Sequence, residues 1–133
     1  MVVNVIDKIA IRRWRASDFN EAVVLNREAE SPLGIPPETG DWTRDMLGIK
    51  MTFLDSGGEF LVGHINARLV VMGGFKPLDE TTAEIKRIRV TPSLHRKGVG
   101  RWFLGLLEDS MRSKGITEAR VSTLSAQTGA IRL

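Results

Sequence analysis

One stretch of the chain, from Thr91 to Gly115, limits the fold more than any other, because it passes from strand to turn to helix within a few residues. Pro92 ends a β-rich run, and apolar side chains then recur at helical spacing at Val99, Phe103, Leu106, Leu107 and Met111. Gly115 directly follows Lys114, at the place where a helix C-terminus favours glycine. The sequence therefore predicts a strand that turns sharply into a helix beginning at about Gly98.

The turn before this helix has the composition of an anion-binding site. Gly98 and Gly100 lack a Cβ atom, so the backbone can turn and a ligand can approach closely, while the first N–H groups of a helix have no partner within it. Arg96, Lys97 and Arg101 add positive charge at the positive end of the helix dipole. We therefore expect the segment from His95 to Arg101 to bind a pyrophosphate. The alternative is a tight turn that binds nothing.

Two common phosphate loops do not match this segment. A Walker loop needs GxxxxGK followed by Ser or Thr, and a dinucleotide fingerprint needs GxGxxG, whereas GVGRWF provides neither. What remains is HRKGVG, His95 to Gly100, placed between a strand and a helix.

The rest of the chain alternates between strands and helices, without an internal repeat or a long linker. A first strand is expected around Ile9 to Trp14, followed by a helix that Asp18 caps together with Glu21. A loop with three prolines, Ser31 to Gly40, precedes a second amphipathic helix, Asp41 to Leu54. The remaining β-rich runs are Phe60–His64, Arg68–Phe75, Ala83–Thr91 and, after the predicted helix, Glu118–Leu124. We expect one α+β domain over residues 1–133, with a mixed, mostly antiparallel twisted sheet between helices in three layers.

Composition excludes several classes of protein. The net charge of +3 comes from 19 basic and 16 acidic residues, which is too balanced for a dedicated nucleic-acid-binding protein. No cysteine is present, so thiolate nucleophiles, cysteine-bound zinc and disulfides are excluded, and His64 has no second metal-ligating residue at a suitable spacing. Asp7 and Lys8 interrupt the apolar run that a signal peptide would need. We expect a cytoplasmic protein that uses no metal and binds neither nucleic acid nor membranes.

In its context, HRKGVG resembles the pyrophosphate-binding motif of the GNAT superfamily of acetyl-coenzyme A dependent N-acetyltransferases, which has Gln or Arg where this chain has His95. AEIKRIRV, Ala83 to Val90, is similar to the family's fourth strand, and the preceding hairpin and two leading helices follow the family's order. The resemblance runs from about Ile9 to the last residue. It implies a three-layer GNAT-like fold whose fourth and fifth strands splay apart to form the cofactor cleft.

The resemblance also implies a reaction and the residues that perform it. Acetyl-coenzyme A is the co-substrate, no metal takes part, and a primary amine of a small molecule or peptide attacks the thioester directly in a ternary complex. Backbone groups of Ile88, Arg89 and Val90 would bind the thioester and the pantetheine arm. The pyrophosphate would be bound by the motif and the residue after it: His95, Arg96, Lys97, Gly98, Val99, Gly100 and Arg101. Glu84 matches a glutamate that acts as the base in some members, often through water; the competing interpretation is an ion pair with Lys86 on the same strand face.

The end of the sequence departs from the family's pattern. SAQTGAIRL, Ser125 to Leu133, is similar to the start of the family's last common helix, with Gln127 in place of an asparagine that contacts coenzyme A. The sequence ends one residue before the tyrosine that acts as the acid, and it contains no tyrosine at all. We therefore expect a domain that is truncated within this helix and whose fifth strand has an open edge, through which a homodimer could form. The alternative function is a catalytically silent module that binds or senses acyl-coenzyme A, or an inactive fragment of such an enzyme.

Overall fold

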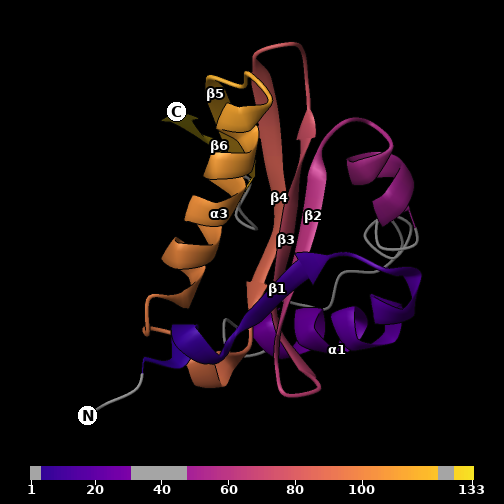
Figure 1. Cartoon of the computed structure of the whole chain (residues 1–133), viewed down its shortest axis with the longest axis vertical. Coiled ribbons are helices and arrows are strands. Elements are labelled where there is room, and N and C mark those ends of the chain that lie inside the picture. Colours follow the sequence, from indigo (N-terminus) through magenta and orange to yellow (C-terminus); the bar gives the residue numbers. More distant parts are fainter. Residues whose placement is uncertain (1–3, 31–47, 123–127) are drawn as a thin grey trace.

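Six strands form one sheet in which the spatial order follows the chain (Figure 1). The computed structural model describes residues 4–30, 48–122 and 128–133. The strands are β1 (Ala10–Arg13), β2 (Glu59–Ile65), β3 (Arg68–Pro77), β4 (Thr82–Val90), β5 (Glu118–Ser122) and β6 (Thr128–Arg132). Neighbouring strands are antiparallel except β4 and β5, which are parallel. This mixed, mostly antiparallel sheet between helices confirms the expected fold class.

The helices cover both faces of the sheet (Figure 1). The long helices are α1 (Phe19–Glu30) and α3 (Val99–Ser113), which pack against opposite faces. The shorter turns are the 3-10 helices η1 (Val5–Lys8), η2 (Ala16–Asp18) and η5 (Pro92–Leu94) and the π-helical turn η4 (Lys50–Leu54). Helix α3 forms because Val99, Phe103, Leu107 and Met111 recur every four residues and are all buried, as the sequence predicts.

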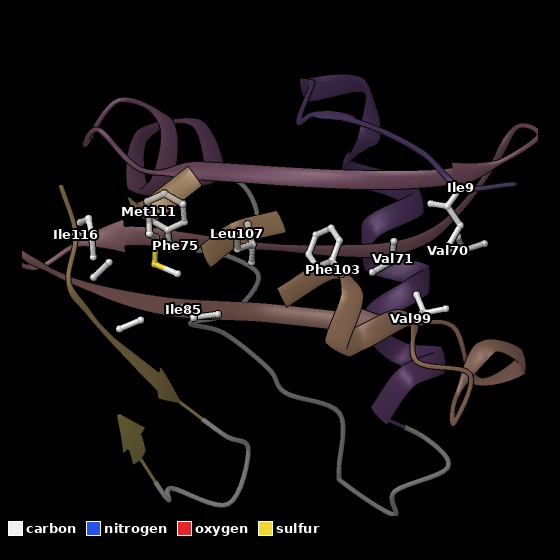
Figure 2. Close-up of a cluster of buried hydrophobic side chains, with 12 residues drawn as sticks. Ile9, Val70, Val71, Phe75, Ile85, Val99, Phe103, Leu107, Met111 and Ile116 are labelled. Atoms are coloured by element: carbon white, nitrogen blue, oxygen red, sulfur yellow. The ribbon is translucent and has the colours of Figure 1, made fainter. Parts of the chain in front are cut away.

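Each face of the sheet has its own apolar core. On the α3 side, Phe103, Leu107 and Met111 lie over Phe75 and Ile85 of the sheet (Figure 2). On the α1 side, Phe60 is surrounded by Trp14 and Phe53, with ring centroids 5.4 and 5.0 Å away in edge-on contacts.

Trp14 is therefore a core residue, and Trp102 is partly buried against the α3-side core. Trp42 lies outside the described residues.

Strand β4 carries a bulge near its C-terminal end. In the ladder with β3, Met72 lies opposite Arg89 and Gly74 opposite Lys86, so two residues of β4 share one position of β3. Within the bulge, Arg87 has a left-handed backbone conformation, with φ of 63°. Gly73 lies beneath it, and a Cβ atom there would come within 3.0 Å of the Ile88 Cα. Gly73 is thus required by close packing against the bulge, whereas a Cβ atom at Gly74 would meet the Glu59 carbonyl and Phe60 of β2.

The parallel ladder between β4 and β5 covers only the first half of β4. Among the described residues it runs from Thr82 and Glu118 to Ile85 and Val121, whereas β4 itself continues to Val90. The predicted divergence of these two strands is therefore present.

Two expectations for the end of the chain are wrong. Residues 128–132 form strand β6, not the start of a helix, and β6 pairs antiparallel with β5. The edge of β5 is consequently covered, because pairing with β6 gives its backbone groups partners within the same chain.

Expectations for the N-terminal half are met in part. Asp18 does not cap α1 through Glu21: its carboxylate accepts a hydrogen bond from the Arg15 N–H and binds the Arg12 guanidinium. Of the second helix, Ile49 and Phe53 are buried as expected, and the part before residue 48 lies outside the described residues, as does the proline-rich loop.

Within residues 4–30, 48–122 and 128–133, no helix combines the length and apolar character needed to cross a membrane.

Candidate active site

The N-terminus of α3 opens onto free space. Gly98 precedes the helix with φ of 78°, a left-handed conformation that favours glycine, and a Cβ atom built there meets nothing within 4 Å. The first hydrogen bond that closes a helical turn runs from the Trp102 N–H to the Gly98 carbonyl at 3.0 Å. The N–H groups of Val99, Gly100 and Arg101 precede it and are the ones a helix leaves for an external acceptor. This local geometry is the one expected for the predicted anion-binding turn before α3.

The cations of the motif surround this opening. Arg96, Lys97 and Arg101 are exposed, and Arg96 has a left-handed φ of 63°. Three non-glycine residues have such a backbone among the described residues; one is Asn66 in a hairpin turn, and the other two, Arg87 and Arg96, lie on either side of this site. Unusual backbone conformations are therefore concentrated where β4 meets α3.

A cavity of about 400 Å³ lies at this junction. Its lining residues come from β4, the motif, the start of α3 and helix α1: Ala29, Ile88, Arg89, Val90, Leu94, His95, Arg96, Gly98, Val99, Gly100 and Arg101. Most of the residues predicted from the sequence are thus brought to one cavity. Lys97 and Glu84 are not in its lining, and Gln127 lies outside the described residues.

The backbone of β4 turns a defined set of groups toward this side. The Thr91 N–H donates to the Val70 carbonyl of β3 at 2.8 Å, and successive peptide groups of a strand point to opposite sides. The carbonyls of Ile88 and Val90 and the N–H of Val90 therefore point away from β3. The N–H and carbonyl of Arg89 point toward Met72 of β3, so Arg89 contributes to the cavity through its side chain.

Two side chains already donate to these outward carbonyls. The His95 Nε2 lies 2.7 Å from the Val90 oxygen and must donate to it, since a carbonyl only accepts. The Arg89 Nη1 donates to the Ile88 oxygen at 3.0 Å. A carbonyl oxygen has two lone pairs, so both groups can still accept a second hydrogen bond from a ligand.

A buried amide on α1 positions the Arg89 side chain. The Asn26 Oδ1 accepts a hydrogen bond from the Arg89 Nε at 2.8 Å, and Asn26 is fully buried. Its Nδ2 has no hydrogen-bond partner within the part of the chain that the structure describes. Neither Asn26 nor Ala29 was among the residues predicted from the sequence. The sequence feature that points to Asn26 is its place as a polar residue in the inward-facing stripe that Ala22 and Leu25 define.

Glu84 lies next to two ammonium groups. Its Oε1 is 3.8 Å from the Nζ of Lys76 on β3 and 3.8 Å from the Nζ of Lys86 on β4. Its side chain is 24% exposed. Ala83 and Ile85 belong to the α3-side core, so alternation places Glu84 and Lys86 on the opposite face, which α1 and η4 cover. The ion pair expected with Lys86 is present, and a second lysine joins it.

The described residues offer no group of three or more His, Asp or Glu side chains that could hold a metal ion. His64 is partly buried in β2. The cavity brings together backbone donors and the cations Arg96 and Arg101, and the Glu84 carboxylate with its two lysines lies outside the cavity lining.

Comparison with known proteins gives one family and many similar folds. The model of the acetyltransferase (GNAT) family matches residues 10–133. An acetyltransferase of the GNAT family from Staphylococcus aureus Mu50 is 20% identical with a TM-score of 0.79, over 89% of this chain and 75% of that one.

Two further structures carry a ligand in their description. PaiA N-acetyltransferase from Thermoplasma acidophilum, in complex with coenzyme A, is 22% identical with a TM-score of 0.67, over 86% of this chain and 79% of that one. N-acetylglutamate synthase from Neisseria gonorrhoeae, complexed with coenzyme A and N-acetylglutamate, is 19% identical with a TM-score of 0.64, over 85% of this chain and 24% of that one. At these identities the likeness concerns the fold.

Proposed function

Since this chain belongs to the GNAT family of acetyltransferases and is therefore an acyltransferase, we propose that it transfers the acetyl group of acetyl-coenzyme A to a primary amine. The amine attacks the thioester directly in a ternary complex. The observation that carries the proposal is the cavity in which the outward backbone groups of β4 and the open N-terminus of α3 meet.

The residues of the cavity fit both halves of the co-substrate. The pyrophosphate would accept from the first N–H groups of α3, with Arg96 and Arg101 nearby and open space at Gly98. The pantetheine arm carries amides, which would pair with the Val90 N–H and with the Ile88 and Val90 carbonyls as an added strand does. His95 would position the motif by its hydrogen bond to Val90.

Glu84 is the proposed base. An alkyl ammonium has a pKa of roughly 10, so it must lose a proton before its nitrogen can attack a thioester. Glu84 is the carboxylate on β4, and its contact with two lysine ammonium groups supports its ability to hold an amine of the acceptor as well. A backbone N–H of the segment from Ile88 to Val90 would polarise the thioester carbonyl, a contact worth a few kcal/mol if it strengthens in the transition state.

We propose a single domain over residues 1–133, a small-molecule or peptide amine as acceptor, and a cytoplasmic location. The absence of cysteine is compatible with a reducing cytosol. Because β6 covers the edge of β5, a dimer through that strand is not proposed.

Calorimetric titration with acetyl-coenzyme A tests the site. In Gly100→Glu a carboxylate enters the cavity without packing strain, because a Cβ atom at Gly100 lies 3.8 Å from Val90. We expect its affinity to fall by more than about tenfold through charge repulsion and lost space. Gly105→Glu is the matched control, since it adds the same charge to the same helix where a Cβ atom meets nothing within 4 Å. Equal binding by all three proteins would refute the site.

Thiol release with a panel of amines tests the reaction. Release that depends on both acetyl-coenzyme A and an amine, and that decreases in Glu84→Gln, supports an N-acetyltransferase with Glu84 as base. Saturable binding without release for any amine would favour the alternative, a silent module that binds acyl-coenzyme A.

A further inference from the structure

We propose that the protein carries its own acetyl acceptor, Lys86, whose Nζ is acetylated by acetyl-coenzyme A bound in the same molecule. This inference rests on the proposed function and names a modification site within it. It is carried by the juxtaposition of a lysine amine, the proposed base and the segment of β4 that would bind the thioester.

Lys86 lies on β4 between Glu84 and Ile88, on the face of the sheet that also carries Glu84. Because of the bulge, Lys86 is the last residue before β4 changes its register against β3 and turns toward the cavity. The side chain is 26% exposed, so it has room to move without being freely solvated.

Lys86 also lies beside Glu84, the proposed base. Direct amine acetylation requires an ammonium group beside a carboxylate that can take its proton, near the thioester. The Lys86 Nζ lies 3.8 Å from the Glu84 Oε1, so the carboxylate already has an amine beside it before any separate acceptor molecule binds. The chain thus assembles two of the three reacting groups by itself, and acetyl-coenzyme A supplies the third.

The proposed step balances as follows. Glu84 takes one proton from the Lys86 ammonium, the nitrogen lone pair attacks the thioester carbonyl carbon, and a C–N bond forms. The C–S bond breaks and its electron pair leaves on sulfur as thiolate. The nitrogen loses its second proton, the thiolate takes up one, and one proton is released overall. The products are acetyl-Lys86 and free coenzyme A, and no other reactant is needed.

Lys76 provides an internal comparison. Its Nζ is also 3.8 Å from the Glu84 Oε1, so the two lysines share the same carboxylate. Lys76 lies on β3 opposite Glu84, whereas Lys86 lies two residues farther along β4 in the direction of Ile88. If contact with the base alone decided reactivity, both lysines would react. If proximity to the thioester segment is also needed, Lys86 reacts and Lys76 does not.

Peptide mapping by mass spectrometry tests the proposal. The purified chain is incubated with acetyl-coenzyme A, and the increase of one acetyl group is located. We expect acetyl-Lys86 to form with a rate constant that does not change with protein concentration, since the reaction is intramolecular. Lys86→Arg should lose this modification, Lys76→Arg should retain it, and Gly100→Glu should slow it by more than about tenfold because it weakens co-substrate binding.

The outcomes separate this inference from the proposed function. If the protein acetylates an added amine but Lys86 stays unmodified, the inference is wrong and the function stands. If acetyl-Lys86 forms equally fast in Gly100→Glu, or as slowly as acetyl-Lys114 forms on the exposed end of α3, the modification is chemical background and the inference is also wrong. If neither Lys86 nor any amine is acetylated by a protein that binds acetyl-coenzyme A, both are refuted. Circular dichroism of each variant confirms that the fold is retained.

Discussion

The two halves of β4 differ in what they do. From Thr82 to Ile85 the strand is paired on both sides, with β3 and β5, and Ala83 and Ile85 are buried in the α3-side core. From Lys86 to Val90 the ladder described is the one with β3, and the side chains are only partly buried. The last three of these residues, Ile88 to Val90, line the cavity. One strand therefore contributes stability where both its edges are paired and a binding surface where one edge faces the cavity.

The bulge separates the two halves. Side chains of a regular strand alternate, so Ile85, Arg87 and Arg89 would share one face. The extra residue shifts this alternation by one: Ile88 and Val90 pack with Ile85 against the α3-side core, and Arg89 reaches Asn26 of α1 on the other face. Without the bulge, two arginines would face the apolar core.

The largest effect is expected from Ile85→Ala in the fully paired half. Ile85 is 1% exposed, so losing its side chain should leave a cavity and lower the free energy of unfolding by about 3 to 4 kcal/mol. Urea denaturation measures this loss. Calorimetry under native conditions should give an unchanged affinity for acetyl-coenzyme A, and a tenfold weaker affinity would contradict the division of β4 into two halves.

Asp18→Asn sharpens the comparison by lowering stability away from β4. Burial by itself would raise the pKa of Asp18, but hydrogen bonds from Arg12 and from the Arg15 N–H lower it below its ordinary value. We expect a loss of about 2 to 3 kcal/mol at neutral pH, because the charged partner of Arg12 is removed. Binding of acetyl-coenzyme A should not change.

The pH dependence of this variant follows from the lowered pKa. The stability that Asp18 contributes is present in full above the ordinary aspartate pKa of 3.8 and is lost as the pH falls through the lower pKa of the folded state. The difference between wild type and Asp18→Asn should therefore be constant from neutral pH to about pH 5 and shrink below pH 4. A difference that grows in acid would show that Asp18 is not held as a charged group.

Gly73→Ala is designed to disturb the bulge itself. A Cβ atom there would come within 2.8 Å of the Ile88 side chain and 3.0 Å of its Cα, so the backbone of the bulge must move. We expect a loss of about 1 to 2 kcal/mol in stability and, in addition, weaker binding of acetyl-coenzyme A.

Gly63→Ala is the control for this prediction. A Cβ atom at Gly63 would also be crowded, at 2.5 Å from Val71, but the atoms that it meets belong to the side chains of Val71, Ile9 and Ile11 and not to the backbone of the bulge. It should lower stability without changing the affinity. If both variants bind acetyl-coenzyme A equally well, the geometry of the bulge is not needed for binding.

The smallest effect is expected at His95, which connects the motif to the end of β4. His95→Ala removes the hydrogen bond to the Val90 carbonyl, and we expect about fivefold weaker binding of acetyl-coenzyme A, equivalent to about 1 kcal/mol. His95→Gln retains an N–H donor and should lose less. Equal losses in the two variants would indicate that the imidazole ring acts in another way.

Much of the site could be predicted because its residues are consecutive. The segment from His95 to Arg101 forms the turn and the first residues of α3, and its glycines and cations lie where local rules place them. Residues that join from elsewhere could not be found in this way. Asn26 and Ala29 come from α1 and Lys76 from β3, and only the packing of those elements brings them to β4.

The end of the chain illustrates the same limit. TGAIR is short enough to continue a helix or to form a strand, and the similarity to a helical pattern favoured the helix. The strand forms because β5 presents an edge of backbone donors and acceptors, and pairing with it satisfies both segments.

The sequence by itself determined the strand, turn and helix around Gly98, the positive charge at the start of α3 and the order of the elements. These follow from apolar spacing and from the conformations open to glycine, which depend on neighbours along the chain. Tertiary structure alone decided where the parallel ladder stops, how the bulge turns Ile88, Arg89 and Val90, and which amines lie beside Glu84. The reason is that backbone pairing and side-chain packing join residues distant in sequence, and local patterns do not specify those partners.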